Sequence, residues 1–346
     1  MTKPAASLTR SALLRSCAPA ALTAAAMALP HAAMAQAFQG TPSTVQGTVT
    51  FDRSTPNVET IRVQGVDAII DWTPATDVNG AALTFLPSGN TATFEGAPGE
   101  TNFAVLNRIL PTAVSTPTEF AGTVQAFLTD GAGNQTGPGG FVAFYSPTGI
   151  IVSGTAVFQV PQLLLTTNEV DDASFSDFAS GTGPLLFSGN VRSIDIQDGA
   201  TLTGTADDSF FIVSAGNITM AGDAYFNGST VYAAGTEMEM SHSSGLFDIV
   251  ITTGVEGQAI THTGSTGGPE VTGPGDNQII YGVTRSVDGS TVGASMLFSG
   301  NLGFDRLVLR PVEHESACDD PARRNKRGSD CGDLHLLDEC GCHGQG

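Results

Sequence analysis

Short runs of apolar and β-branched residues, each bounded by turn-forming residues, recur along most of the chain. Examples are residues 48–51, 59–63, 68–72, 83–86 and 91–95, which Gly, Pro, Asn, Asp or Ser separate from one another. Runs this short, closed by residues that favour turns, are typical of β-strands. No window of 12 or more residues combines apolar positions at helical spacing with capping residues. The sequence therefore predicts an all-β fold.

Composition excludes the main alternatives. Charged residues make up 14% of the 346 residues, whereas an average soluble domain contains roughly 25%. A helical bundle or coiled coil needs Lys, Glu, Arg and Leu at helical spacing, which this composition does not supply. Hydrophobic residues reach 40%, enough to bury a sizeable core, so a disordered chain is not expected.

The middle of the chain shows the most regular pattern. Apolar or β-branched runs follow one another at residues 191–196, 201–203, 210–214, 218–220 and 230–233. Large apolar residues return after 17 to 20 positions, at Ile194, Phe211 and Val231. Such a return indicates a β-solenoid, in which each coil adds one strand to each of several parallel sheets. A β-sandwich remains possible on pattern alone, because hairpin-forming Asn-Gly and Asp-Gly pairs also occur.

Residues 1–35 have the features of a secretory signal peptide. Lys3, Arg10 and Arg15 precede an apolar run at residues 17–29, and Ala33-Met34-Ala35 forms a small-residue cleavage site. The apolar run is shorter than the ~20 residues that a membrane-spanning helix needs. We therefore expect export to begin with this segment and the mature chain to start at Gln36.

Charge and cysteine distribution separate a body from a tail. Removal of the signal peptide takes the net charge from −20 to −23, and the seven basic residues between positions 36 and 317 are all Arg. A surface this acidic repels nucleic acid and anionic lipid, so no nucleic-acid partner is expected. The body, residues 36–310, contains no Cys, and its stability must come from core burial.

The tail, residues 311–346, differs in composition from the body. It contains a basic run at residues 323–327 and four cysteines, Cys318, Cys331, Cys340 and Cys342. Two disulfides could close it. A zinc site with His343 is a weaker alternative, because the spacing matches no standard zinc motif. The abrupt change of composition favours a third interpretation, a non-globular tail from an altered reading frame that shortened a longer protein.

Several segments of the body resemble the haemagglutination-activity domain, the N-terminal secretion domain of filamentous-haemagglutinin-like exoproteins. Residues 103–109 (FAVLNRI) are similar to the family's VLNRI stretch, and residues 144–151 (FYSPTGII) to its NPNGI motif with the apolar residues before it. Residues 156–167, and the upstream residues 69–72 and 90–94, follow the family pattern in order. Together the segments cover most of residues 40–305.

The resemblance implies a right-handed parallel β-helix with short antiparallel capping strands, secreted by the two-partner route of Gram-negative bacteria. The implied partner is an outer-membrane β-barrel transporter with periplasmic POTRA domains. The implied destination is the cell surface or the medium. There an adhesin of this type would bind host or cell-surface glycans or proteins, and no cofactor is implied.

The residues that match the family's motifs are the candidates for recognition by the transporter. They are Asn107, Arg108, Ile109, Ser146, Pro147, Thr148, Gly149 and Ile150. Each also has a structural interpretation, since Asn107 and the 146–150 segment suit turns and Arg108 suits an ion pair. The sequence departs from the family pattern at Ser146 and Thr148, which replace two Asn residues. Pro147 and Gly149 would then hold the turn, because proline fixes φ and glycine permits positive φ.

An enzyme is not expected. Polysaccharide-cleaving β-helices need a cluster of carboxylates on one exposed sheet, and the nearest candidates, Asp195 with Asp198 and Asp207 with Asp208, suit loops better. His242 and His262 show no metal-ligand spacing. A β-helix that binds or cleaves polysaccharide remains the alternative function.

Overall fold

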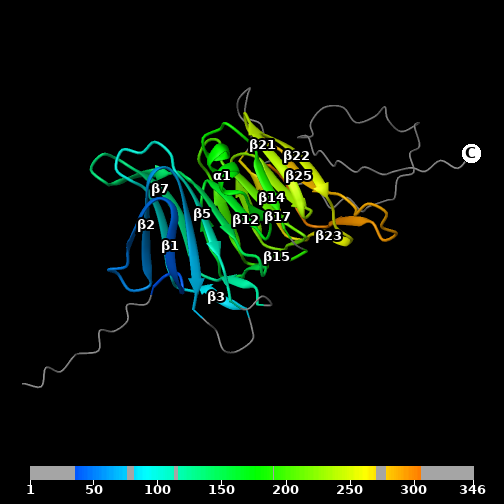
Figure 1. Ribbon diagram of the computed structural model, residues 1–346, viewed down its shortest axis with the longest axis horizontal. Coiled ribbons are helices and arrows are strands. Elements are labelled where there is room, and N and C mark those ends of the chain that lie inside the picture. Colours follow the sequence, from blue (N-terminus) through cyan, green and yellow to red (C-terminus); the bar gives the residue numbers. More distant parts are fainter. Residues whose placement is uncertain (1–35, 76–81, 113–115, 190, 270–277, 305–346) are drawn as a thin grey trace, which may run out of the picture. The chain divides into compact units, whose positions relative to one another are not determined.

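The computed structural model describes residues 36–75, 82–112, 116–189, 191–269 and 278–304. The expected signal peptide and the Cys-containing tail, with all four of its cysteines, lie outside the described residues. Within the described residues the chain forms the predicted all-β fold, a parallel β-helix (Figure 1). Each coil contributes one strand to each of three rows, and strands of successive coils pair in parallel.

The first row consists of β3 (Leu83–Leu86), β6 (Thr118–Phe120), β10 (Ile150–Val152), β15 (Ser193–Ile196), β18 (Asn217–Met220), β23 (Gly257–His262) and β26 (Ala294–Phe298). The second row begins with the first part of β2 (Val58–Pro74). It continues with β4 (Thr91–Gly96), β7 (Thr123–Thr129), β11 (Val157–Gln159), β16 (Thr201–Gly204), β19 (Asp223–Phe226), β24 (Ser265–Gly268) and β27 (Asn301–Phe304).

The third row begins with the second part of β2. It continues with β5 (Ala104–Ile109), β9 (Phe141–Tyr145), β12 (Gln162–Thr166), β17 (Phe210–Ala215), β20 (Thr230–Ala234) and β25 (Ile280–Thr284). Because β2 belongs to both the second and the third row, these two rows form one continuous sheet.

Antiparallel strands accompany the parallel β-helix, as expected. The strand β1 (Gly40–Asp52) pairs with β2 at the N-terminal end, and β8 (Gln135–Pro138) forms a hairpin with β7. A separate antiparallel sheet contains β13 (Glu169–Val170), β14 (Leu185–Ser188), β21 (Glu237–Ser243) and β22 (Leu246–Thr253). The helix α1 (Asp172–Ala179) lies between β13 and β14 in the chain. We call β13, α1, β14, β21 and β22 the cover.

The cover packs on the outer face of the third row, so the strands of that row are buried on both sides. Along β5, Val105 and Ile109 belong to the interior core, whereas Leu106 belongs to a second apolar cluster shared with the cover. Strands buried on both faces have nearly continuous apolar sequences. This burial explains runs such as FVAFY in β9 and QLLLT in β12.

Ile194, Phe211 and Val231, whose spacing suggested the coils, do not lie in one row of strands. Ile194 lies in the first row and pairs with Ile218, whereas Phe211 lies in the third row and pairs with Thr230. Phe211 points into the interior core and Val231 into the cluster under the cover. The β-solenoid prediction is confirmed, but the spacing that suggested it combined residues from two rows and two faces. The parallel register also excludes the β-sandwich.

The first described residues close the N-terminal end of the β-helix. The Phe38 side chain is fully buried, with its ring stacked on Phe85 at 4.7 Å and edge-on to Trp72 at 5.1 Å. Its backbone N–H donates to Oε2 of Glu59 over 3.2 Å. Burial raises the pKa of Glu59, although the Arg53 guanidinium 2.6 Å away opposes the shift. The residues just after the expected cleavage site are therefore an integral part of the core.

Candidate functional site

The candidate segments 107–109 and 146–150 lie in neighbouring coils. Strand β5 pairs with β9, with Asn107 opposite Phe144 and Arg108 opposite Tyr145, and Ser146 directly follows β9. The fold thus brings together two segments that are far apart in the sequence. Alternation along β5 points Asn107 and Ile109 inward and Arg108 outward.

Asn107 is buried inside the helix, with no exposed surface. Its Oδ1 accepts a hydrogen bond of 3.0 Å from Nε1 of Trp72, and its Nδ2 donates to the carbonyl of Ala143 over 3.2 Å. A buried amide must have its polar atoms satisfied, and these two bonds do so across three coils. In the folded chain Asn107 therefore links β2, β5 and β9 from within. The neighbouring Ile109, also fully buried, aligns with Trp72.

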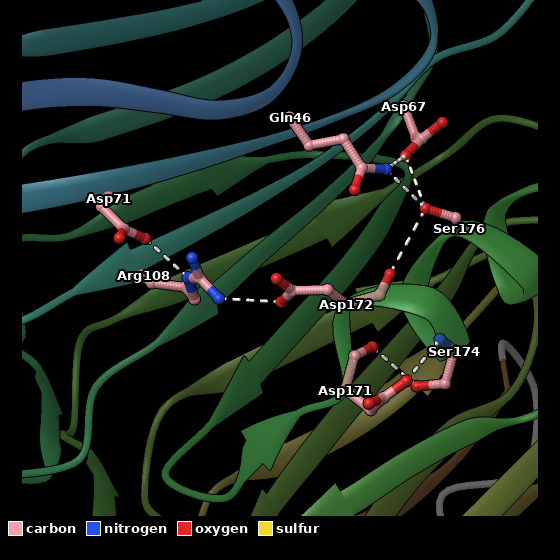
Figure 2. A network of polar contacts seen from close by, with 8 residues as sticks. All are labelled: Gln46, Asp67, Asp71, Arg108, Asp171, Asp172, Ser174 and Ser176. Atoms are coloured by element: carbon pink, nitrogen blue, oxygen red, sulfur yellow. Dashed lines mark hydrogen bonds and ion pairs between the residues drawn. The ribbon is translucent and has the colours of Figure 1, made fainter.

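Arg108 connects the first coil to the cover. Its Nε lies 2.6 Å from Oδ1 of Asp71 on β2, and its NH1 lies 2.8 Å from Oδ1 of Asp172, the first residue of α1 (Figure 2). Only 14% of the Arg108 side chain is exposed. Burial acts to lower the pKa of Arg108, but the two carboxylates outweigh it and raise that pKa. The guanidinium is thus a charged bridge between elements that are 101 positions apart, from Asp71 to Asp172.

Local capping explains where α1 begins. Asp171 has an extended backbone, and its carboxylate accepts a 2.9 Å hydrogen bond from the backbone N–H of Ser174. Asp is among the preferred N-cap residues because it satisfies one of the free N–H groups of the first turn. The negative charge of Asp172 in the first turn also suits the positive end of the helix dipole.

A second polar link joins α1 to the first coil. The hydroxyl of Ser176 donates to Oδ2 of Asp67 over 2.7 Å, and Nε2 of Gln46 on β1 donates to Oδ2 of Asp67 at 2.5 Å and to the Ser176 hydroxyl at 2.7 Å (Figure 2). Together with Arg108, these contacts fix α1 to β1, β2 and β5. The sequence analysis did not predict this network, because α1 has only eight residues and is too short to show a helical pattern of apolar positions. The Asp171-Asp172-Ala173-Ser174 start was its one sequence signal.

The 146–150 segment forms the turn from β9 to β10. The Ser146 hydroxyl lies 2.9 Å from that of Thr118 and 3.2 Å from that of Thr148, while the Ser146 N–H donates to the carbonyl of Thr166. The hydroxyls thus form a short ladder between coils. Ser146, Thr148 and Ile150 are buried, and Pro147 is partly exposed.

Gly149 is required by the geometry of this turn. Its φ is +111°, and a Cβ there would lie 3.2 Å from the carbonyl oxygen of Ser193 and 3.3 Å from Cβ of Pro117. Its own carbonyl accepts a 2.9 Å hydrogen bond from the N–H of Thr118. The turn therefore packs tightly between the coil before it and the coil after it.

The four acidic candidates, Asp195, Asp198, Asp207 and Asp208, are partly or fully exposed. Asp195 is partly exposed on β15, and Asp198, Asp207 and Asp208 are exposed in the loops between strands. Among the described residues there is no group of three or more His, Cys, Asp or Glu side chains placed to hold a metal ion.

His262 occupies a buried position near the C-terminal end of the described helix. Its Nε2 lies 2.7 Å from the Thr266 hydroxyl, which lies 2.6 Å from the Tyr232 hydroxyl. The imidazole stacks on Phe298 with ring centroids 5.6 Å apart. Burial lowers the pKa of His262 to about 4. At neutral pH this histidine is an uncharged member of the core.

No protein-family model and no curated protein sequence matches the chain. Solved structures similar to it include two secretion domains. The HMW1 secretion domain from Haemophilus influenzae has a TM-score of 0.46 and 17% identity, covering 70% of this chain and 56% of that one. The filamentous hemagglutinin secretion domain has a TM-score of 0.42 and 13% identity, covering 77% of this chain and 92% of that one. The chain thus spans little more than half of the HMW1 domain.

Over the described residues, no helix has the length and hydropathy that crossing a membrane would require.

Proposed function

We propose that the chain is a non-enzymatic exoprotein, secreted by the two-partner route through an outer-membrane transporter that recognises its β-helix. The observation that carries the proposal is the pairing of β5 with β9, which joins the two motif segments in adjacent coils. The parallel β-helix that the motif resemblance implied is also the fold observed. The destination is the cell surface or the medium, where an adhesin role follows from the same resemblance.

The architecture suits export of an unfolded chain. Each coil pairs with the coil before it, so a completed coil offers an edge on which the next one forms. Coils that form outside the membrane in this order cannot slip back, and their folding free energy favours export. The closed N-terminal end, built around Phe38, provides the first template.

The test is secretion with and without a co-expressed cognate transporter. Arg108→Gln and Asn107→Ala probe the first motif, and Asn168→Ala is the matched control for Asn107. Asn168 is equally buried, and its Nδ2 donates to the Ser214 hydroxyl and to the carbonyl of Gly235, neither of which belongs to a motif segment.

We expect the native chain to reach the medium only with the transporter. Arg108→Gln should reduce export more than it reduces stability, and Asn168→Ala should reduce both in proportion. Equal export without any transporter would overturn the proposal and favour an ordinary secreted β-helix that binds or cleaves polysaccharide.

A further inference from the structure

The strand β22 is the last strand of the antiparallel sheet in the cover. One of its edges pairs with β21, and no strand of the described residues pairs with the other. We propose that Tyr281 and Arg285 keep the chain monomeric, because their side chains cap this open edge and block its pairing with β22 of a second copy. The proposal concerns self-association and does not depend on the route of export.

The hairpin between β21 and β22 decides which backbone groups reach the open edge. Its loop residues, Ser244 and Gly245, both have positive φ, +52° and +80°. The residues that flank such a two-residue loop exchange backbone hydrogen bonds, and alternate residues of each strand then face the partner strand. Along residues 246–251, where the register is unbroken, the even-numbered residues bond to β21. The odd-numbered residues, which direct their N–H and C=O groups to the open edge, are Phe247, Ile249 and Ile251.

Two side chains from the end of the third row occupy this edge. The hydroxyl of Tyr281 on β25 accepts a 3.1 Å hydrogen bond from the N–H of Phe247. NH1 of Arg285, which directly follows β25, donates to the carbonyl of Ile251 over 3.2 Å. A donor at one end of the edge and an acceptor at the other are therefore already satisfied. Ile249 lies between them, and no side chain of the described residues caps its N–H or C=O.

The two capped groups are the ones that a second copy would need. If two β22 strands met antiparallel about a twofold axis at Ile249, Phe247 of each copy would lie opposite Ile251 of the other. The N–H of Phe247 would then donate to the C=O of Ile251. These are the groups that Tyr281 and Arg285 hold in the single chain. Because an open strand edge readily pairs with another chain, the two side chains protect an edge that is complementary to itself.

The exposed side chains of β22 are compatible with this register. Val250, which is 49% exposed, would lie opposite Asp248 of the second copy. No two carboxylates of β22 would then face each other directly, so the pairing carries no direct like-charge contact between the two strands. A charge introduced at position 250 would meet Asp248 of the other copy, which makes the register testable.

The experiment measures self-association of the purified mature chain by sedimentation equilibrium, with a reductant that keeps the tail cysteines from linking chains. Tyr281→Phe removes only the hydroxyl, and Arg285→Ala removes the guanidinium. The double variant Tyr281→Phe/Arg285→Ala is compared with Tyr145→Phe/Arg62→Ala. Tyr145 belongs to the same apolar cluster as Tyr281, and both are 8% exposed. The Arg62 side chain is 42% exposed and that of Arg285 43%, but Arg62 pairs with Glu95 in the second row.

We expect the double variant to dimerise about 100-fold more tightly than the native chain. Pairing of two native chains must break four cap bonds, each of which contributes roughly threefold or more to an equilibrium constant. The control variant should associate no more than the native chain. In the dimer the amide of Ile249 should gain protection from hydrogen exchange, whereas the amide of Asp248, already bonded to β21, should not change.

Val250→Lys and Val250→Asp, each added to the double variant, test the register. Lys opposite Asp248 should tighten the dimer, Asp should weaken it, and added salt should reduce both effects. Equal effects of the two charges would contradict the pairing about Ile249.

The inference is overturned if the folded double variant associates no more than the native chain, if the control variant gains equally, or if a dimer forms without protection at Ile249. Should the double variant not fold, Tyr281→Phe alone replaces it, since it removes a single oxygen atom. Its expected gain is about tenfold, because each native pair then retains only the two cap bonds from Arg285. Unchanged association of folded Tyr281→Phe would equally overturn the inference.

Discussion

The stability of an Asn107→Ala variant distinguishes a structural role of Asn107 from a role in transporter recognition. Substitution to Ala removes the bond to the Trp72 indole and the bond to the Ala143 carbonyl, both inside the helix. A buried polar group left without a partner costs about 1–3 kcal/mol. The Ala143 carbonyl has a second lone pair for other donors, so its share of the loss is the smaller one. We expect the free energy of unfolding to fall by about 2–4 kcal/mol.

The assay is urea and thermal unfolding of the purified chain. For a chain of this size, 1 kcal/mol corresponds to about 2 °C in Tm, so Asn107→Ala should melt about 4–8 °C lower. Trp72→Phe leaves Oδ1 of Asn107 unpaired and should also destabilise. The double variant Trp72→Phe/Asn107→Ala should lose less than the sum of the two single changes, with a coupling of about 1–2 kcal/mol.

Asn301→Ala is the control, because Asn301 is exposed on β27, and it should change stability by less than about 0.5 kcal/mol. Native stability in Asn107→Ala would refute a structural role for this side chain. If such a variant still failed to be exported, Asn107 would be a contact for the transporter in the unfolded chain.

Three further results are expected. The folded pKa of His262, about 4, lies below the ordinary histidine value of 6.5, so its contribution to stability is present above pH 6.5 and is lost as pH falls toward 4. At pH 5 the loss in the free energy of unfolding is about 2 kcal/mol. Urea titrations at pH 5 and 7.5 should show that His262→Gln loses less stability at the lower pH than the native chain does. An equal loss in both chains would contradict this role of His262. Phe38→Ala should cost about 3–5 kcal/mol in the same assay, because a fully buried ring leaves a cavity at the N-terminal end, and a loss below about 1 kcal/mol would show that the end is not closed by this ring. Gly149→Ala should lower stability by about 2–3 kcal/mol through both its positive φ and its tight contacts. Gly89→Ala, with φ +82° and no atom within 4 Å of the added Cβ, should lose less, and equal losses would refute the packing argument.

Local sequence predicted many strands well. The runs at 83–86, 91–95 and 201–203 correspond to β3, β4 and β16 within a residue. The predictions succeeded because each run alternates or concentrates apolar residues between strong turn formers. The assignment of Ile194 and Phe211 to one row was wrong, because a run of apolar residues does not indicate which sheet the strand joins.

The candidate residues divide in a similar way. The ion pair suspected for Arg108 is present, but its partners, Asp71 and Asp172, come from the first coil and from α1. Neither partner was identifiable from spacing, because each lies tens of positions from Arg108. The recognition role assigned to the 107–109 and 146–150 segments remains a prediction for the secretion experiments.

The sequence by itself determined that this chain is β-rich, with short strands separated by glycine- and proline-bounded turns. These properties depend on residues within a few positions of one another, so local pattern contains them. Only the tertiary structure decided that Asn107 points inward, that the third row is buried on both faces, and that α1 joins the first coil through Arg108 and Ser176. Those outcomes depend on the register between coils and on insertions that fold back over them. Contacts of that kind form between residues up to 130 positions apart, and no local pattern specifies them.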